Sequence, residues 1–151
     1  MMTKGTQALE KDSLKGGEVV ARIKQVSVFI ENQPGRLTAM LEALEKNGVD
    51  IRALSISDTA DFGIVRMILP DATKGAETLR QAGFTTRLDW ILSAEIPDRP
   101  GGLFKTVAEP LAKAGINVKY LYFYIEAAAG KSMVVVKTDD IEKAEKVLKS
   151  L

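Results

Sequence analysis

The chain has 151 residues, of which 21 are Lys or Arg and 20 are Asp or Glu, so its formal net charge is +1 at pH 7. A charge this close to zero gives no overall field that would attract nucleic acid or an anionic membrane, and no apolar run reaches the roughly 20 residues of a membrane span. Cys and His are both absent, which excludes disulfides, thiolate nucleophiles, Cys-based zinc sites and histidine general bases. We therefore expect a small cytoplasmic protein without a metal or cofactor, and the composition weighs against an enzyme.

The chain begins with a polar segment, residues 1–17, that carries both signs of charge. The segment lacks the apolar core of a signal peptide, so we expect a mobile leader. Residues 18–30 then contain no Gly or Pro and are rich in Val and Ile, and residues 84–96 form an equivalent stretch. Each stretch predicts one or two consecutive strands, and we expect a short extra strand at 18–23 and at 84–89.

A helix is predicted directly after each of two Pro-Gly sequences. Apolar residues recur at helical spacing from Leu37 to Leu44, and Gly48 follows as a C-terminal cap. The second helix, residues 101–114, is also closed by a Gly, but it is one residue longer and holds Pro110 in its interior. Because proline removes a hydrogen-bond donor and clashes with the preceding turn, we expect a kink or bulge there.

Two hairpins and two further helices complete the pattern. Alternating apolar residues on both sides of a Gly-containing turn are typical of hairpin strands. The strands are predicted at 50–58, 64–69, 117–126 and 131–137. Residues 71–82 and 139–148 favour helices, with Asp71 and Asp139 as their N-terminal caps.

These elements form a tandem repeat, because Pro34 and Pro100 lie 66 positions apart and the residues around them match. Each copy gives strand, helix, strand, strand, helix, and the first is followed by a further strand. The predicted fold is therefore α+β, a ferredoxin-like βαββαβ unit used twice, with antiparallel sheets and the helices on one face. We divide the chain into the leader, a first domain at 18–89 and a second domain at 90–151.

The second repeat reaches Leu151 directly after its last helix, without a closing strand of its own. An unpaired inner strand at 90–96 would expose its ladder groups and invite aggregation. We therefore expect the N-terminal strand at 18–23 to complete the sheet of the second repeat.

The two repeats share a pair of short motifs. They read Asn32-Gln33-Pro34-Gly35-Arg36-Leu37 followed by Gly48-Val49-Asp50-Ile51, and Asp98-Arg99-Pro100-Gly101-Gly102-Leu103 followed by Gly115-Ile116-Asn117-Val118. These residues resemble the ACT domain, a small ferredoxin-like regulatory unit that binds amino acids and other effectors. The resemblance covers roughly Lys24 to Leu151, and the chain looks most like stand-alone proteins made of two ACT domains. It implies an allosteric sensor of a small molecule.

The family resemblance also implies where a ligand binds, between the strand-to-helix loop of one ACT unit and the start of the second strand of another. The first site would combine Asn32, Gly35, Arg36 and Leu37 with Asn117. The second site would combine Asp98, Gly101, Gly102 and Leu103 with Asp50. Ile30 and Ile96 stand where the serine-binding version of the family has a histidine, which argues against serine.

Elementary chemistry supports an amino acid at such a site. A helix N-terminus offers unpaired backbone N–H groups and a partial positive charge to the ligand carboxylate, while side-chain oxygens accept from the ammonium group. Asn32 and Asn117 are neutral, whereas Asp98 and Asp50 would bring two carboxylates together and disfavour an anionic ligand. We therefore rank the first site above the second for a neutral amino acid. The simpler alternative is that Asn or Asp beside Pro-Gly only caps a helix.

Tyr120, Tyr122 and Tyr124 recur at period two, opposite the face of Leu121, Phe123 and Ile125. We expect the second set to lie in the core. A tyrosine stripe on an open sheet face is typical of a partner contact, which predicts a homodimer through the tyrosine face. The alternative is a strand that is merely half exposed.

Two other functions remain open. The alternative to the sensor is a protein–protein interaction module with degenerate ligand sites, which would regulate a partner by docking. A small hydrolase on the same fold, such as an acylphosphatase-like enzyme, would need a different loop, and the serines here have no His partner. Fold alone does not decide among these functions.

Overall fold

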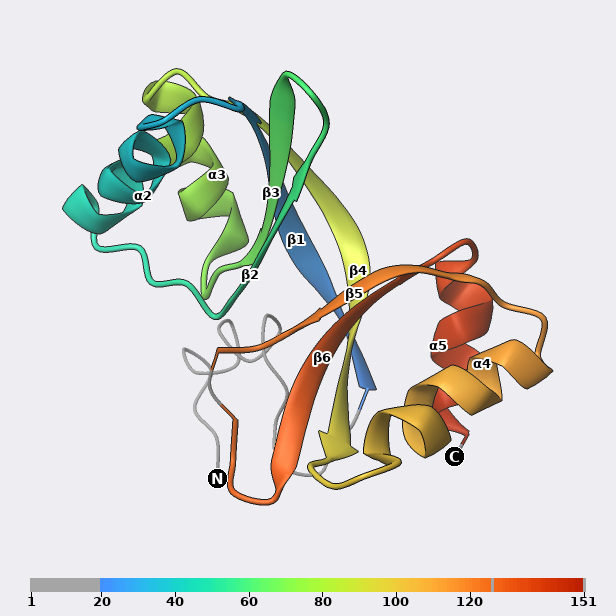
Figure 1. The fold of residues 1–151 in the computed structure, drawn as a ribbon. Coiled ribbons are helices and arrows are strands. Elements are labelled where there is room, and N and C mark those ends of the chain that lie inside the picture. Colours follow the sequence, from blue (N-terminus) through green and yellow to red (C-terminus); the bar gives the residue numbers. More distant parts are fainter. Residues whose placement is uncertain (1–19, 126, 151) are drawn as a thin grey trace. The chain divides into compact units, whose positions relative to one another are not determined.

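The computed structural model describes residues 20–125 and 127–150, so the predicted leader lies outside the described residues. The strands and helices follow one another in the predicted order (Figure 1). The strands are β1 (Val20–Glu31), β2 (Ala53–Asp58), β3 (Phe62–Ile68), β4 (Thr85–Pro97), β5 (Val118–Phe123) and β6 (Lys131–Thr138). The helices are α2 (Arg36–Lys46), α3 (Ala72–Gln81), the π-helix η1 (Phe104–Ala108), α4 (Glu109–Lys113) and α5 (Ile141–Lys149).

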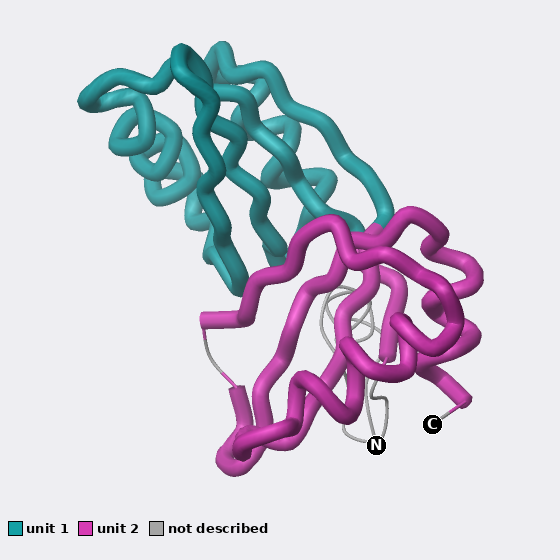
Figure 2. Tube along the Cα trace, turned by 45° about the vertical axis from the view of Figure 1, so that its right-hand side comes forward, with its two compact units in different colours: residues 1–12, 24–90 teal, residues 13–23, 91–151 magenta. Residues whose placement is uncertain are grey.

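The described residues form two compact units (Figure 2). Unit 1 comprises residues 24–90, and unit 2 comprises residues 20–23 together with 91–150. Strands β1 and β4 each belong to both units. The sequence allowed one or two strands at each of these places, and the structure has one continuous strand of 12 residues for β1 and one of 13 residues for β4.

Unit 1 is a ferredoxin-like βαββαβ unit. Strand β3 pairs antiparallel with both β1 and β2, and helices α2 and α3 lie together on one face of these strands (Figure 1). The core forms where alternate residues of the strands meet the helices. Its buried residues include Val26, Val28, Ile30, Met40, Leu44, Val65, Met67 and Leu79.

Unit 2 repeats the arrangement, with β6 paired antiparallel to both β4 and β5 and with α4 and α5 on one face (Figure 1). The α+β repeat predicted from the sequence is thus confirmed. Val20 of β1 is buried in the core of this unit, so the N-terminal part of β1 contributes to it. The other buried core residues include Leu92, Ala94, Ile96, Val107, Leu111, Val134, Val136 and Leu148.

The predicted irregularity near Pro110 is confirmed. The helix after the second Pro-Gly runs as a π-helix over Phe104–Ala108 and continues as the α-helix Glu109–Lys113, with Pro110 in the first turn of that segment. Proline has no N–H to donate to the carbonyl four residues earlier. A π-helical turn absorbs one extra residue at the same place, which accounts for the greater length of this helix.

The caps of α3 and α5 confirm one prediction and correct another. Asp71 caps α3 through a hydrogen bond from the Lys74 N–H to its side chain, at 3.1 Å. The cap of α5 is Asp140, which accepts from the Lys143 N–H at 3.0 Å, so the prediction of Asp139 was wrong. Asp139 accepts instead from the Asn117 N–H at 3.3 Å. The sequence pattern of an N-terminal cap fits both adjacent aspartates. In the structure β6 ends at Thr138 and α5 begins at Ile141, so Asp140 is the residue directly before the helix.

The prediction for the two faces of β5 was also wrong in part. Leu121 packs against the core, but Phe123 and Ile125 are 43% and 72% exposed. Tyr122, on the opposite face, is only 6% exposed within the single chain. Alternation along a strand separates two faces, but it does not say which face the rest of the chain covers.

Candidate ligand-binding sites

The two strand-to-helix loops have the same backbone hydrogen bonds. In the first loop, the N–H groups of Asn32, Gln33, Arg36 and Ala39 donate to the carbonyls of Asp61, Glu31, Gln33 and Gly35. In the second loop, the N–H groups of Asp98, Arg99, Gly102 and Lys105 donate to the carbonyls of Gly130, Pro97, Arg99 and Gly101. All distances lie between 2.8 and 3.3 Å. Each loop is therefore held both by its own turn and by the neighbouring hairpin.

Each loop enters its helix through a glycine with positive φ, 91° at Gly35 and 84° at Gly101. Few other residues adopt this conformation without strain. Among the described residues no side chain caps α2 or η1. The first-turn N–H groups, such as those of Leu37 and Thr38, have no partner within an α-helix, so they are the donors that a ligand carboxylate can accept from.

Three of the predicted site residues have structural roles inside their own unit. Leu37 packs against the core of unit 1, and Leu103 packs against the core of unit 2. Arg36 turns back along the loop, with its Nε 2.9 Å from Oε1 of Glu31 and its guanidinium carbon 5.0 Å from the centre of the Phe84 ring. These side chains hold the loops in place, and the Arg36 N–H already donates to the Gln33 carbonyl at 3.3 Å.

Asp50 and Asn117, the polar residues just before β2 and β5, differ in the hydrogen bonds that they form. Asp50 accepts from the N–H of its neighbour Ile51 at 2.8 Å. The backbone of Asn117 forms two hydrogen bonds with Asp139. Its N–H donates to Oδ1 of Asp139 at 3.3 Å, and its carbonyl accepts from the Asp139 N–H at 3.2 Å. The side chain of Asn117 is exposed, as are those of Asn32 and Asp98. The side chain of Asn117 thus forms no hydrogen bond with a described residue, whereas one carboxylate oxygen of Asp50 is occupied.

Each unit contains part of each predicted site. Unit 1 carries Asn32, Gly35, Arg36, Leu37 and Asp50, and unit 2 carries Asp98, Gly101, Gly102, Leu103 and Asn117. Within each unit the loop glycine and the first-turn residues are brought together. The pairing of one unit's loop with the other unit's Asn117 or Asp50 stays a prediction.

Gly102 distinguishes the second loop from the first. A Cβ atom at this position would lie 2.0 Å from the carbonyl oxygen of Pro97, which is far inside van der Waals contact. The matched position in the first loop is Arg36, which carries a side chain. The backbone of the second loop therefore approaches the end of its strand more closely than the first loop does.

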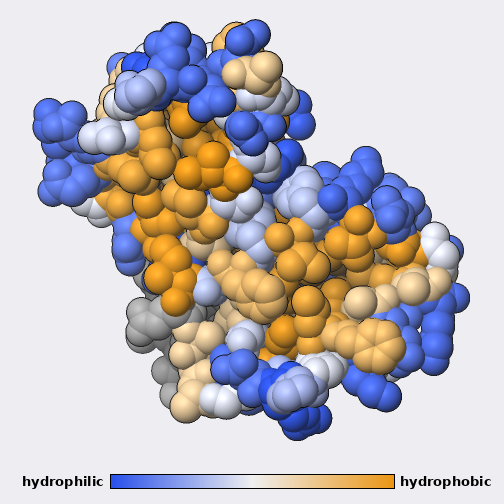
Figure 3. Space-filling view, viewed as in Figure 1, coloured by the Kyte–Doolittle hydropathy of each residue, from blue (hydrophilic) through white to orange (hydrophobic). Residues whose placement is uncertain are grey.

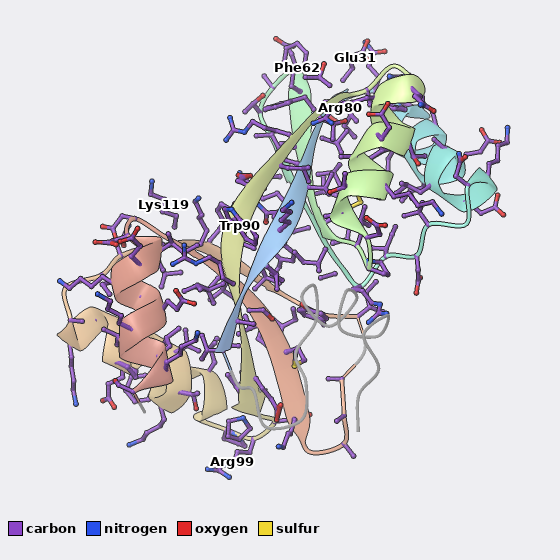
Figure 4. All side chains as sticks on the ribbon, turned by 180° about the vertical axis from the view of Figure 1, so that it is seen from behind. Glu31, Phe62, Arg80, Trp90, Arg99 and Lys119 are labelled. Atoms are coloured by element: carbon purple, nitrogen blue, oxygen red, sulfur yellow. The ribbon has the colours of Figure 1, made fainter. Side chains whose placement is uncertain are left out.

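Unit 2 also contains a cavity of about 450 Å³ that the sequence analysis missed. Its wall is apolar, and its polar side chains are Glu95, Arg99, Thr106 and Lys131. The full lining is Val20, Ala94, Glu95, Ile96, Pro97, Arg99, Thr106, Gly130, Lys131 and Leu148. These residues come from strands, a loop, a hairpin and two helices, so no local sequence pattern predicts that they line one cavity. Arg99 projects from the loop at the end of β4 (Figure 4).

Within residues 20–125 and 127–150, no group of three or more Asp, Glu, His or Cys residues is placed to hold a metal ion. No helix in this part of the chain is long and apolar enough to cross a membrane.

The fold and the paired loops define a tandem of ferredoxin-like units. A family model described as an ACT domain pair matches residues 21–150. The chain belongs to this family, whose domains are in general ligand-binding regulatory domains. A comparison with curated proteins found no match.

Solved structures agree with this assignment. Protein BT0572 from Bacteroides thetaiotaomicron is 33% identical, with a TM-score of 0.79 and coverage of 87% of this chain and 89% of that protein. The ligand-free regulatory subunit of aspartate kinase from Thermus thermophilus is 16% identical, with a TM-score of 0.60 and coverage of 88% and 96%. The corresponding subunit from Thermus flavus is 18% identical, with a TM-score of 0.56 and the same coverage. The two kinase subunits share the fold.

Proposed function

We propose that this chain is a non-enzymatic regulatory protein that binds an amino acid at its strand-to-helix loops and acts as a sensor. The observation that supports the proposal most directly is the duplicated loop. Two segments 66 positions apart form equivalent hydrogen bonds and lead into helices without a side-chain cap. Each loop also carries an exposed polar side chain, Asn32 or Asp98.

In this proposal the ligand carboxylate accepts from the first-turn N–H groups, where the helix dipole also favours negative charge. The ammonium group donates to side-chain amide oxygens, which Asn32 and Asn117 supply at the first site. The second site would offer Asp98 and Asp50, of which Asp50 already accepts from Ile51. We therefore keep the first site as the principal one for a neutral amino acid.

Sensing requires that the ligand bind two arrangements of the protein with different affinity, because equal affinity shifts no equilibrium. The proposed sites draw on both units of the chain, so ligand binding would favour one arrangement of the two units. The regulated target then responds to that arrangement. This is the simplest way in which a protein without catalytic groups can report an amino acid concentration in the cytoplasm.

A thermal-shift screen of the full chain against the common amino acids at millimolar concentration tests the proposal. A ligand at about 100 times its Kd adds about 2.7 kcal/mol of stability, which raises Tm by a few degrees for a chain of this size. We expect one amino acid, or a few related ones, to raise Tm, and Asn32→Ala and Asn117→Ala to remove the effect. No shift with any amino acid would contradict the proposal.

The alternative, a module that docks on a partner protein, is favoured by exposed apolar side chains. Phe29 and Phe62 are 41% and 56% exposed, and the register of β1 and β3 places both on one face of unit 1. Apolar side chains also reach the surface on the side seen in Figure 3. An interaction module would retain partner binding in Asn32→Ala and would show no ligand-dependent shift in Tm.

We also propose a homodimer through the tyrosine face of β5. Tyr122 is buried within the single chain, and its ring centre lies 6.5 Å from that of Tyr120. Tyr120 and Tyr124 are half-buried and are the members of the stripe that a second copy can cover further. Light scattering at micromolar concentration should give twice the chain mass, and Tyr120→Lys should give a folded monomer. A monomeric mass for the unaltered chain would rule this interface out.

A further inference from the structure

The cavity of unit 2 combines an apolar wall with a charged rim. Val20, Ile96 and Leu148 line it and are 8%, 4% and 3% exposed, so these side chains are fixed by the core around them. A volume of about 450 Å³ falls in the lower part of the range of small-molecule sites, roughly 300–1,000 Å³. The cavity is therefore of the size of a small metabolite with an apolar part.

The rim carries three charged side chains, of which two are already paired with each other. Nζ of Lys131 lies 2.6 Å from Oε2 of Glu95, and the Glu95 side chain is 14% exposed. Arg99 forms no ion pair with any described residue, and it lines the same cavity. The uncompensated charge of the lining is thus one guanidinium, which can bind a carboxylate through two parallel hydrogen bonds.

The backbone fixes the position of Arg99. Its N–H donates to the Pro97 carbonyl at 3.0 Å, and its carbonyl accepts from Gly102 at 2.9 Å. The N–H of the adjacent Asp98 donates to the Gly130 carbonyl at 3.0 Å, which joins the loop to the hairpin that carries Lys131. The hydroxyl of the half-buried Thr106 also lines the cavity. The polar end of the cavity is therefore built from segments that hydrogen-bond to one another.

We propose that this cavity binds a small aliphatic monocarboxylate, with the carboxylate on Arg99 and the hydrocarbon chain against Val20, Ile96 and Leu148. A dianion such as phosphate fits less well, because Glu95 would repel the second negative charge. An α-amino acid also fits less well, because its ammonium group would approach the like charge of Lys131, which is already paired with Glu95. The cavity lies within unit 2, and its Arg99 belongs to the same loop as Asp98, Gly101 and Gly102 of the second proposed amino-acid site.

Three probes with one carbon skeleton test these points in NMR titrations of the full, isotope-labelled chain. 4-Methylpentanoate carries the carboxylate alone, leucine adds the ammonium group, and 4-methylpentan-1-ol carries no charge. We expect 4-methylpentanoate to give saturable shifts at the amides of residues 95, 96, 98, 99, 106, 130 and 131. The alcohol and leucine should shift these amides more weakly at equal concentration.

Arg99→Gln removes the proposed charge at an exposed position, and Lys119→Gln removes one charge from the same unit outside the cavity (Figure 4). Arg99→Gln should weaken 4-methylpentanoate binding about fivefold or more, because it removes hydrogen bonds to a charged group. Lys119→Gln should change it less than about twofold, as expected for a distant exposed charge. The proposal is overturned if 4-methylpentanoate gives no saturable shift up to about 20 mM, if the alcohol or leucine binds as well, or if both variants bind equally.

Discussion

Arg22 on β1 and Glu145 on α5 form an ion pair, with 2.6 Å between Nη2 and Oε1, although they are 123 positions apart in the sequence. Both residues belong to unit 2. Lys149, one turn further along α5, approaches the other carboxylate oxygen with its Nζ at 3.1 Å. The network therefore fastens the beginning of β1 to the last helix of unit 2.

The Arg22 guanidinium holds the pKa of Glu145 below its ordinary value of 4.5, and Lys149 acts in the same direction against the opposing effect of burial. Because the folded-state pKa is lower than the unfolded one, the ionised carboxylate contributes stability above about pH 4.5. This contribution is lost as the pH falls through the lowered pKa. We predict that Glu145→Gln lowers the free energy of unfolding at pH 7 by about 1 kcal/mol, and that the difference from the unaltered chain disappears in acid.

Denaturant titrations from pH 7 to about pH 3, a range that brackets the carboxylate pKa, check this prediction. Glu45→Gln is the matched control, because Glu45 is exposed and forms no ion pair with any described residue. A difference between Glu145→Gln and the unaltered chain that stayed constant across this range would contradict the assigned role.

Val20 tests whether the N-terminal part of β1 stabilises unit 2. Val20 is 8% exposed in the core of that unit, so Val20→Ala removes buried methyl groups and should lower the free energy of unfolding by about 1–2 kcal/mol. Ile125→Ala, at a position 72% exposed, should have little effect. Hydrogen exchange should show the loss of protection in residues 91–150. Unchanged protection there would mean that the N-terminal strand is dispensable.

Gly102 tests the close approach of the second loop to its strand. Gly102→Ala places a methyl group 2.0 Å from the Pro97 carbonyl oxygen, so the loop must shift, and we expect a loss of about 1–3 kcal/mol in unfolding free energy. Gly63→Ala is the control, because its nearest neighbours lie at 3.5 Å. Equal stability of the two variants would show that the second loop tolerates a side chain as the first one does.

Much of the fold could be predicted from local sequence patterns, that is, from residues close to one another in the sequence. The repeat is visible because Pro34 and Pro100 begin matched helices, and Pro110 marks the irregular turn because its missing N–H acts locally. The choice between Asp139 and Asp140 as a cap depends on where β6 ends. The continuity of β1 and β4 likewise depends on tertiary packing, which a local pattern does not contain.

The sites were less predictable than the fold. The glycines and first-turn amides of the loops are local features, and the structure places them as a helix start requires. The contacts of Arg36 with Glu31 and Phe84 join residues from α2, β1 and the loop before β4, so sequence spacing alone does not predict them. The unit 2 cavity could not be predicted from a local sequence pattern, because residues as far apart in the sequence as Val20 and Leu148 both line it.

The central claim is that an amino acid binds at the strand-to-helix loops. The most direct measurement is an amide NMR titration of the full chain with the amino acid that raises Tm most. We predict saturable shifts at residues 35–38 and at Asn117, with the same Kd for both, and loss of both in Asn32→Ala. Shifts confined to other parts of the chain, or shifts at the loop that persist unchanged in Asn32→Ala, would contradict the account.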